Sequence, residues 1–501
     1  MSYPTFSYPL EPAVARNGFR SARYRLRDIP PFTQARALLP RPVLPGFEDW
    51  HELYWRAWEI AWHHLHQPRA ESGFIANYID SAFNDHTFMW DSAFMLQFGI
   101  YARRVFDFTG TLDNFYAKQH DDGFICREIN TQTGADYFYP HDPNGTGPNI
   151  LAWAEWRAYR HTLDEERLTQ VFWPLLGYHR WCRAHRTWPG GLYWATGHSS
   201  GMDNQTRVPN GSLYHQHWTW VDANMQAALS CHVLAQMASA LEEQEAAAEL
   251  NEEHAFLVRE INSRFWDEAS GFYYDADPRG ELSKVKSIGA YWGLLDPQLV
   301  PEDRLTAFVR HLREENAFSR PHRIPAQSAD SPGYNAENGD YWRGGVWPPT
   351  NYMVLKGLRL RGQRKLAHQI ARNHLENVSA VFQHTDTLWE NYAPEHQAPG
   401  EPSKPGFVGW TGLTPIAILL EDVIGISVDW PLRRVTWDRY LETDERYGVT
   451  NFPLGNEGTL DLVGDRQEIE VASDVPFTLV VRDREETLQV AVPAGTTTIT
   501  R

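Results

Sequence analysis

The sequence predicts a mainly α-helical fold, an (α/α)6 barrel or toroid of helical hairpins, followed by a small C-terminal antiparallel β domain. Three observations support this prediction. Segments with helical spacing of apolar residues recur between about residues 46 and 424. Long loops rich in Gly, Pro and Trp recur between these segments. After about residue 425, the apolar residues alternate by two instead.

Ten segments have the apolar spacing of a helix. They are 48–66, 91–107, 148–162, 164–187, 221–247, 250–266, 301–315, 350–361, 364–382 and 410–424. In 364–382 the apolar residues follow one stripe, whereas 221–241 is apolar or small nearly all round, as is typical of a helix buried on every side. These segments would supply most of an inner and an outer ring. A helical-repeat solenoid is the alternative, but no repeat of about 34 to 47 residues is visible.

Changes in composition predict three parts of the chain. Residues 1–45 are rich in Pro and Arg, and we expect an irregular N-terminal extension packed on the body. Residues 46–424 form the predicted barrel, and residues 425–501 form a β-sandwich-like domain with alternating positions such as Ile469 and Val471. For this domain we expect structural support or a contact within a homo-oligomer, with carbohydrate binding as the alternative.

The composition favours a sugar ligand. Of 501 residues, 13% are aromatic, including 21 Trp, and the flat apolar indole with one N–H donor suits the face of a sugar ring. The net charge is −18 and no cluster of Lys or Arg stands out, so we do not expect a nucleic-acid partner.

Neither a membrane span nor a cofactor is expected. No apolar run reaches about 18 residues, and the N-terminus lacks a secretion signal, so we predict a cytoplasmic protein. Cys126, Cys182 and Cys231 lie far apart and indicate neither a disulfide framework nor a metal-binding pair. His63–His64 and His215–Gln216–His217 leave metal binding open as an alternative, although we expect no metal.

The stretch HSSGMDNQTR (198–207) presents Asp203 in a segment that favours turns. Asp203 as part of an Asx turn or as a helix N-cap is the simple structural interpretation. Trp188, Trp194 and Met202 are near in sequence, and apolar surroundings would raise the pKa of Asp203 and keep it protonated. A general acid needs that property.

Two further stretches combine charge with indole rings. Trp90 and Asp91 precede a predicted helix, where Asp91 is either an N-cap or a ligand for sugar hydroxyls. The stretch ENGDYWRGGVWPPTNY contains Trp342, Arg343 and Trp347. It is either a buried structural clamp or a binding loop in which Arg343 holds polar substrate groups or a catalytic carboxylate.

Glu390 lies between aromatic residues in LWENYAPE and is the candidate for a second carboxylate. Glycoside hydrolysis requires two such groups, one to protonate the leaving oxygen and one to activate water or attack the sugar. Asp203 and Glu390 are far apart in sequence. Only a closed toroid with both loops on one rim would bring them together.

Together, the motifs resemble glycoside hydrolase family 63, especially the bacterial branch that contains mannosylglycerate and glucosylglycerate hydrolases; trehalase belongs to the same clan. The matching elements are Trp90–Asp91, Gly123–Phe124–Ile125 with Arg127, SGMDN (200–204), YWRG–VWP (341–348), WENY (389–392) and GWTG (409–412). The resemblance implies an (α/α)6 barrel and exo-acting, inverting cleavage of a small soluble α-glucoside or α-mannoside.

The resemblance also implies roles for individual residues. Asp203 is similar to the general acid and Glu390 to the general base. Residues that match the motifs around the sugar are Trp90, Asp91, Arg127, Asn204, Trp342, Arg343, Trp347, Tyr392 and Trp410.

Some positions depart from the family pattern. The chain lacks the PGGRF and QWDYPNGWAP stretches of trehalases. Gln205–Thr206 replaces Ser–Pro after the Asp–Asn pair, which leaves the aglycone open, although Arg207 offers a partner for a carboxylate. A sugar epimerase or isomerase on the same toroid, or a non-catalytic sugar-binding protein, is the alternative function.

Overall fold

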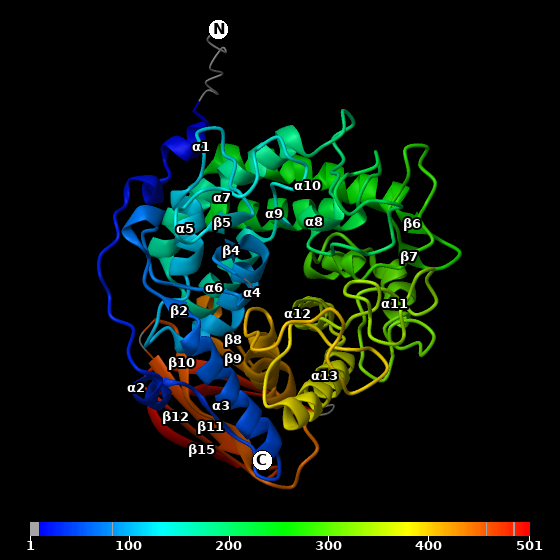
Figure 1. Cartoon of the computed structure of the whole chain (residues 1–501). Coiled ribbons are helices and arrows are strands. Elements are labelled where there is room, and N and C mark those ends of the chain that lie inside the picture. The colour runs from blue at the N-terminus through cyan, green and yellow to red at the C-terminus, as the bar shows by residue number, and fades with distance from the viewer. Residues whose placement is uncertain (1–9, 83, 457, 484–485, 501) are drawn as a thin grey trace.

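The computed structural model describes residues 10–82, 84–456, 458–483 and 486–500. Helices are arranged in a ring, and strands from the C-terminal part lie together at one side of it (Figure 1). The strands of the C-terminal sheets begin at Ile426. The mainly helical fold with a C-terminal sheet region therefore agrees with the sequence-based prediction.

Helices of the ring follow one another along the chain. They are α3 (Glu48–His63), α4 (Met89–Gly99), α5 (Gly110–Ala117), α6 (Leu151–Thr162), α7 (Glu165–His185), α9 (Val221–Ala240), α10 (Gln244–Arg264), the 3-10 helix η5 (Ile288–Leu295), α11 (Glu302–Arg310), α12 (Pro348–Leu360), α13 (Arg364–Thr385) and the π-helix η7 (Thr414–Ile424). Short turns connect the helices within the pairs α6–α7, α9–α10 and α12–α13, and longer loops lie between other helices. The shorter helices α1 (Pro12–Ala15), α2 (Phe32–Ala35) and α8 (Gly197–Ser200) lie outside this series.

Two helices of the ring have no counterpart among the predicted segments, α5 and η5. Helix α5 has 8 residues, too few for a clear stripe, and η5 (IGAYWGLL) is apolar all round and wound as a 3-10 helix. Helix α9 also ends earlier than predicted, because Glu242 adopts a left-handed conformation with φ 60° and turns the chain into α10.

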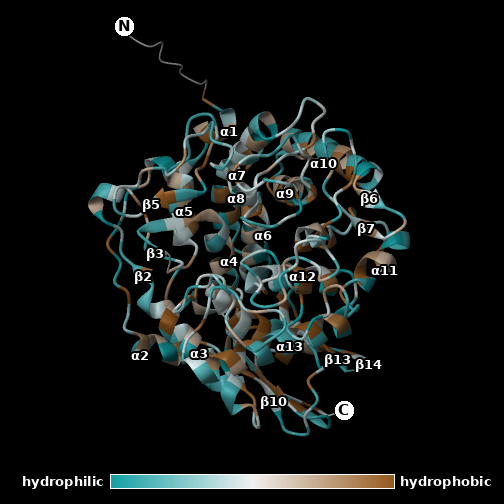
Figure 2. Cartoon of the chain, turned by 45° about the vertical axis from the view of Figure 1, so that its right-hand side comes forward, coloured by the Kyte–Doolittle hydropathy of each residue, from teal (hydrophilic) through white to brown (hydrophobic). Residues whose placement is uncertain are grey.

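The helices of the ring differ in how much of their surface is buried. All residues of α4 are buried, and α9 is buried along almost its whole length, as its all-round apolar sequence predicts. In α13 the apolar stripe is buried, including Leu366, Ile370 and Val378, and the exposed residues are polar. Figure 2 shows the same division, with hydrophobic segments toward the middle and hydrophilic segments at the surface.

The C-terminal strands form two sheets. One has the order β1-β10-β11-β12-β15 and the other β14-β13-β9-β8. The strands are β1 (Arg41–Val43), β8 (Ile426–Asp429), β9 (Arg434–Asp438), β10 (Tyr447–Leu454), β11 (Gly458–Gly464), β12 (Glu468–Ser473), β13 (Phe477–Asp483), β14 (Glu486–Val492) and β15 (Gly495–Thr500). Two details differ from the prediction. Strands β9 and β13 pair in parallel, and β1 from the N-terminal segment pairs with β10.

The C-terminal halves of several ring helices lie at one end of the ring, here called the base, around a cavity of about 450 Å³. Its lining includes Tyr101 just after α4, Arg157, Val233, Leu295, Arg359 and Glu421 from the C-terminal halves of α6, α9, η5, α12 and η7, and Val428 and Arg482 from the sheets. Buried ion pairs join the parts: Lys356 binds Glu421 at 2.7 Å, and Arg359 binds Asp438 of β9 at 2.7 Å. The strands therefore close the base.

The turn into the first of these strands depends on a glycine. Gly425 ends η7 with φ 97°, and a Cβ atom there would lie 2.0 Å from the carbonyl oxygen of Asp438. Only glycine allows this close approach of helix end and strand.

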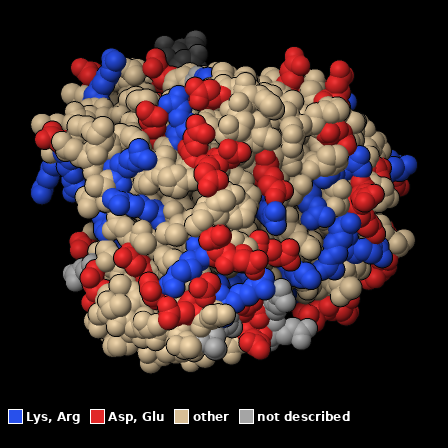
Figure 3. Space-filling model, turned by 90° about the horizontal axis from the view of Figure 1, so that it is seen from below, with Lys and Arg blue, Asp and Glu red and all other residues tan. Residues whose placement is uncertain are grey.

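In the part of the chain that the structure describes, no helix has the length and apolar composition needed to cross a bilayer. On the face that Figure 3 draws, Lys and Arg are interspersed with Asp and Glu. This face has no broad basic area of the kind that binds nucleic acid.

Candidate active site

Asp203 lies in a turn just after α8, at the end of the ring opposite the base cavity. A capping box between Thr196 and Ser199 fixes the start of α8. Gly201 then adopts φ 76°, and its missing Cβ leaves room for the indole of Trp90, which would lie 3.2 Å from such an atom. The sequence thus folds the GMDN turn directly against the Trp90 ring.

Burial raises the pKa of Asp203, whereas the charges of His198 and Arg127 lower it. The raised pKa is the direction that the sequence predicts. The indoles of Trp188 and Trp194 instead pack against each other and against His215.

Glu390 lies in the loop between α13 and η7 and is held at its backbone from both sides. Its N–H donates to the carbonyl of Lys404 at 3.0 Å, and its carbonyl accepts from Nε1 of Trp410 at 2.8 Å. The hydroxyl of Tyr341 donates to Oε1 at 2.9 Å. Burial raises the pKa of Glu390 to about 7, although the Tyr341 hydrogen bond opposes this, and the charge of Asp203 adds to the increase.

The loops bring Asp203, Glu390 and Asp91 into one electrostatic neighbourhood. Besides burial, the charges of all three carboxyl groups raise the pKa of the Tyr341 hydroxyl. Burial is the main cause of the strongly raised pKa of Asp91, and the charge of Glu390 raises it further. These groups come from segments that are far apart in sequence and meet only because the ring closes.

Trp90 and Asp91 occupy the first turn of α4, directly after a strand pairing between β4 (His86–Phe88) and β5 (Glu128–Asn130). Both side chains are buried. Nε1 of Trp90 and Oδ1 of Asp91 are buried with no hydrogen-bond partner among the described residues. An unused donor beside an unused acceptor is an arrangement that sugar hydroxyls satisfy.

Arg127 supplies positive charge to this neighbourhood. Its Nε donates to the carbonyl of Asn144 at 2.8 Å, and its guanidinium lies 4.8 Å from the ring centre of Phe138. The charge of Arg127 lowers the pKa of both Asp91 and Asp203. It therefore lies with the carboxyl groups, as the motif match predicts.

Asn204, Trp342 and Trp347 connect the loops to one another. Asn204 Nδ2 donates to the carbonyl of Asp340 at 2.9 Å, and its Oδ1 accepts from the N–H of Trp342 at 2.9 Å. The indoles of Trp342 and Trp347 are buried and stack with their centres 3.8 Å apart and nearly parallel. This stacked pair fits the clamp interpretation and fixes the turn that follows Asp203.

Arg343 forms its ion pair within its own loop, whereas the rings of Tyr392 and Trp410 also contact His322 and Trp347 of another loop. Arg343 binds Asp340 at 2.7 Å, so the carboxylate it holds is a neighbour in the loop rather than Glu390 or Asp203. Tyr392 is fully buried, and its hydroxyl oxygen accepts from the N–H of Trp389 at 3.3 Å. Trp410 supports Glu390 through the hydrogen bond already described.

The expectation that Arg207 offers a partner for a substrate carboxylate is wrong. Arg207 is buried and binds Asp222 at 2.7 Å, with Asp275 at 3.7 Å. Its charge is neutralised inside the protein, where it anchors the GMDN loop to the start of α9.

Sequence reasoning missed Tyr341 and His198. Tyr341 opens the YWRG motif, and its left-handed backbone, with φ 64°, lies beside Asp340 with φ 36°. Such strain in non-glycine residues concentrates at functional sites, although it has no sequence signal of its own. His198 is the first residue of the stretch that contains Asp203, and only the fold of α8 shows that it acts on that carboxyl group.

Residues 84–411 match the model of a family described as the mannosylglycerate hydrolase MGH1-like glycoside hydrolase domain. The chain therefore belongs to this family of glycoside hydrolases. The matched segment contains the GMDN, YWRG and WENY loops and thus every element of the rim described above.

Individual relatives of the chain have low sequence identity to it. An uncharacterized protein of Borreliella burgdorferi is 25% identical over 415 residues, covering 79% of this chain and 85% of that protein. A probable mannosyl-oligosaccharide glucosidase of Schizosaccharomyces pombe is 28% identical over 230 residues, covering 43% of this chain and only 28% of that protein.

Solved structures show the same fold. The GH63 mannosylglycerate hydrolase of Thermus thermophilus in complex with glucose has a TM-score of 0.58 and 22% identity, covering 72% of this chain and 98% of that chain. Neutral trehalase Nth1 of Saccharomyces cerevisiae has a TM-score of 0.55 and 13% identity, covering 71% of this chain and 76% of that chain. At these identities the likeness establishes the fold alone.

Proposed function

We propose that this glycoside hydrolase is an exo-acting, inverting enzyme that cleaves a small α-glucoside or α-mannoside. The observation that carries the proposal is that the charge of Asp203 raises the pKa of Glu390, while the charges of both groups raise the pKa of the Tyr341 hydroxyl. Two carboxyl groups near one another, on separate loops, are the minimum equipment for this chemistry.

In the proposed mechanism Asp203 donates its proton to the glycosidic oxygen as the bond to the anomeric carbon breaks. Glu390 removes a proton from a water molecule that attacks the opposite face of the sugar. The raised pKa of Asp203 favours the protonated form that an acid needs. The hydrogen bond from Tyr341 favours ionised Glu390, as a base requires. Inversion requires a separation of roughly 6.5–9.5 Å between the carboxyl groups, so that the water fits between them.

The other rim residues would bind the sugar. Trp90 and Asp91 offer an unused donor and acceptor at the first turn of α4, and Arg127 lies close to the same carboxyl groups. Arg343, Asn204, Trp342, Trp347, Tyr392 and Trp410 would shape the loops around it. The names of the relatives favour a glucoside or mannoside. We propose that the group linked to the sugar is small.

We further propose that the ring is an (α/α)6 barrel of residues 46–424 with residues 425–501 as a separate β domain. The proposed inner helices are α4, α6, α9, η5, α12 and η7, because their C-terminal ends line the same base cavity. Outer helices such as α7, α10 and α13 follow them along the chain.

A panel of α-glucosides and α-mannosides, including glycerate conjugates and disaccharides, tests the proposal by the hexose released. Proton NMR of the first sugar formed reports its anomer, and inversion is expected. Asp203→Asn and Glu390→Gln should each reduce kcat by about 10²–10⁴-fold while sugar binding persists. Glu401→Gln, which changes an exposed acid farther along the same loop, is the matched control and should retain turnover.

Three results would contradict specific parts of this proposal. Retention of the anomer rejects the inverting mechanism. Undiminished activity of either carboxyl variant removes that residue from the mechanism. Conversion of free hexose to an isomer, without hydrolysis of any glycoside, would favour an epimerase or isomerase.

A further inference from the structure

Two groups of His, Cys, Asp and Glu side chains in the described residues lie close enough to hold a metal ion. One is His179, Cys231 and Glu253, and the other is His232, His254 and Asp296. In each group the potential ligand atoms lie within 4.8 Å of one another. Because Cys231 and His232 are neighbours on α9, and Glu253 and His254 on α10, the two groups lie side by side and differ in their surroundings.

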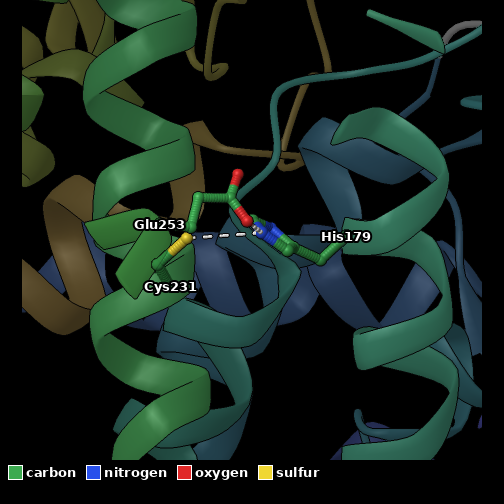
Figure 4. Close-up of side chains that lie close together, drawn as sticks. All are labelled: His179, Cys231 and Glu253. Carbon is green, nitrogen blue, oxygen red and sulfur yellow. Dashed lines mark hydrogen bonds and ion pairs between the residues drawn. The ribbon is translucent and has the colours of Figure 1, made fainter. Parts of the chain in front are cut away.

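The side chains of the first group already have hydrogen-bond and ion-pair partners within the protein. Figure 4 shows the three side chains pointing toward one another between the helices, with His179 in contact with both Cys231 and Glu253. Glu253 also accepts from the Tyr193 hydroxyl at 2.6 Å and binds Arg183 at 3.2 Å. A cation would have to displace these donors beside an arginine, so this group serves as a buried hydrogen-bond network.

The second group lacks such a competing cation. Among the described residues, the ion pair of Asp296 is with Nε2 of His254, at 2.6 Å. The other oxygen, Oδ1, is fixed by the N–H of Gln298 at 2.9 Å, which orients the carboxylate as outer hydrogen bonds orient metal ligands. Asp296 is fully buried and directly follows η5, so its position is rigid.

His232 supplies an imidazole nitrogen whose present partner is a neutral side chain, and it gives access from the cavity. The side-chain amide nitrogen of Gln236 lies 2.6 Å from Nε2 of His232. Because Gln236 is uncharged, a metal ion can displace it from Nε2 without breaking an ion pair. His232 and Gln236 also line the cavity of about 450 Å³ at the base of the ring, which gives an ion a path and room for coordinated water.

We propose that His232, His254 and Asp296 form a binding site for one divalent transition-metal ion, of which Zn²⁺ is the best match. Two imidazoles and one carboxylate are the donor set of such ions, and water from the cavity completes the coordination. The ion replaces the proton on Nε2 of His254, which is released to solvent, while the flexible Gln236 amide turns away. The site joins α9, α10 and the end of η5 at the base, away from the catalytic rim.

The test uses the full chain without a histidine tag and does not depend on glycosidase activity. Titration with Co²⁺ is followed by visible absorption, and Zn²⁺ affinity is measured by competition with a chelating dye. We expect one ion per chain and a Co²⁺ spectrum without a thiolate charge-transfer band. Zn²⁺ should also raise the Tm of the protein, since it binds the folded state.

Matched variants separate the two groups. His232→Gln and His254→Gln should weaken binding by at least about tenfold and abolish the rise in Tm, whereas Cys231→Ser should leave both unchanged. His232 is partly exposed, so its variant is expected to fold, as circular dichroism checks. The absence of binding to the wild type would overturn the proposal. Binding that survives in His232→Gln would also overturn it, as would a thiolate band that Cys231→Ser removes.

Discussion

The pKa values of buried carboxyl groups are shifted in opposite directions at the two ends of the helical ring. At the rim, burial raises the pKa of Glu390 to about 7 and also raises those of Asp203 and Asp91. At the base, the pKa of Glu421 is lowered to about 2, because Lys356 and Arg157 overcome the effect of burial.

The difference does not come from burial, because Glu390 and Glu421 are each 4% exposed. It comes from the cation at contact distance. Glu421 binds Lys356 at 2.7 Å and Arg157 at 3.0 Å, whereas the direct partner of Glu390 is the neutral hydroxyl of Tyr341. No ion pair between described residues includes Glu390 or Asp203, and the charges of Lys404 and Arg127 lower the pKa values of these groups less than burial raises them. The rim carboxyl groups can therefore exchange protons near neutral pH, which acid–base chemistry requires. The base uses the same residue type to hold helices and strands together.

The largest expected effect comes from breaking the network at the base. Lys356→Met leaves Glu421 and Asp422 short of a buried cation, so we expect a loss of about 3–5 kcal/mol in the free energy of unfolding. Urea denaturation measures this loss. The pKa of Glu421 is lower in the folded protein than in the unfolded chain, so ionised Glu421 stabilises the fold, and this stabilisation is lost as the pH falls. The variant, which lacks the Lys356 partner of Glu421, should therefore unfold at a higher pH on acidification.

Arg364→Met is the control for this effect. Arg364 lines the same cavity, and none of the ion pairs between described residues includes it. The change should cost less than about 0.5 kcal/mol, as is usual for a surface position. Equal destabilisation by both variants would show that the cavity wall as a whole, rather than the buried network, stabilises the base.

The sequence predicts most of the helices but not all of them. Helix positions follow from periodicity, because burial on one or all sides leaves a pattern, as in α13 and α9. The short α5 and the 3-10 helix η5 leave no such pattern. The turn at Glu242 lies in a segment rich in helix-forming residues, LEEQEAAAEL, so its position is set by packing rather than by propensity.

In the candidate site, the sequence also predicts individual residues but not the contacts between them. Asp91 and Glu390 stand out in the sequence because each lies beside an aromatic residue, and Asp203 because it lies in a turn-forming stretch after a Trp-rich segment. Arg343 and Arg207 were given ligand-binding roles for their charge, but sequence does not show that Asp340 and Asp222 neutralise them. Partners of this kind, like the Tyr341 contact with Glu390, depend on how the loops cross in three dimensions.

The pH dependence of the wild-type enzyme should reflect the raised pKa of Glu390 at the rim. If Glu390 is the base, activity requires its ionised form, and a pKa of about 7 places the acidic limb of kcat/KM near pH 7. The rate should fall about tenfold for each pH unit below that limb. A pH–rate profile measures this. An acidic limb near pH 4 would mean that Glu390 titrates like an exposed carboxyl group.

Tyr341→Phe should move that limb. The variant removes the hydrogen bond that favours ionised Glu390, so the pKa rises further and the acidic limb shifts upward by about 1–2 pH units. The matched control is Tyr334→Phe, which removes a hydroxyl that donates to Glu395 at 2.8 Å in the neighbouring loop. The control should leave the limb unmoved, and a shift of the limb in both variants would indicate general loosening of the loops.

The smallest expected effect concerns the positive charge of Arg127, whose ion pair, at 3.9 Å, is with Glu128 rather than with Asp203. Arg127 lowers the pKa of Asp203 without an ion pair to it, so Arg127→Gln should raise that pKa. If Asp203 must be protonated to act as the acid, the alkaline limb of the pH–rate profile then moves to higher pH. The shift should stay below about one pH unit, because the charge acts through partly solvated surroundings. Arg343→Gln, whose charge is neutralised by Asp340, should leave the position of this limb unchanged even if sugar affinity falls. A shift toward lower pH in Arg127→Gln would contradict the placement of Arg127 beside the acid.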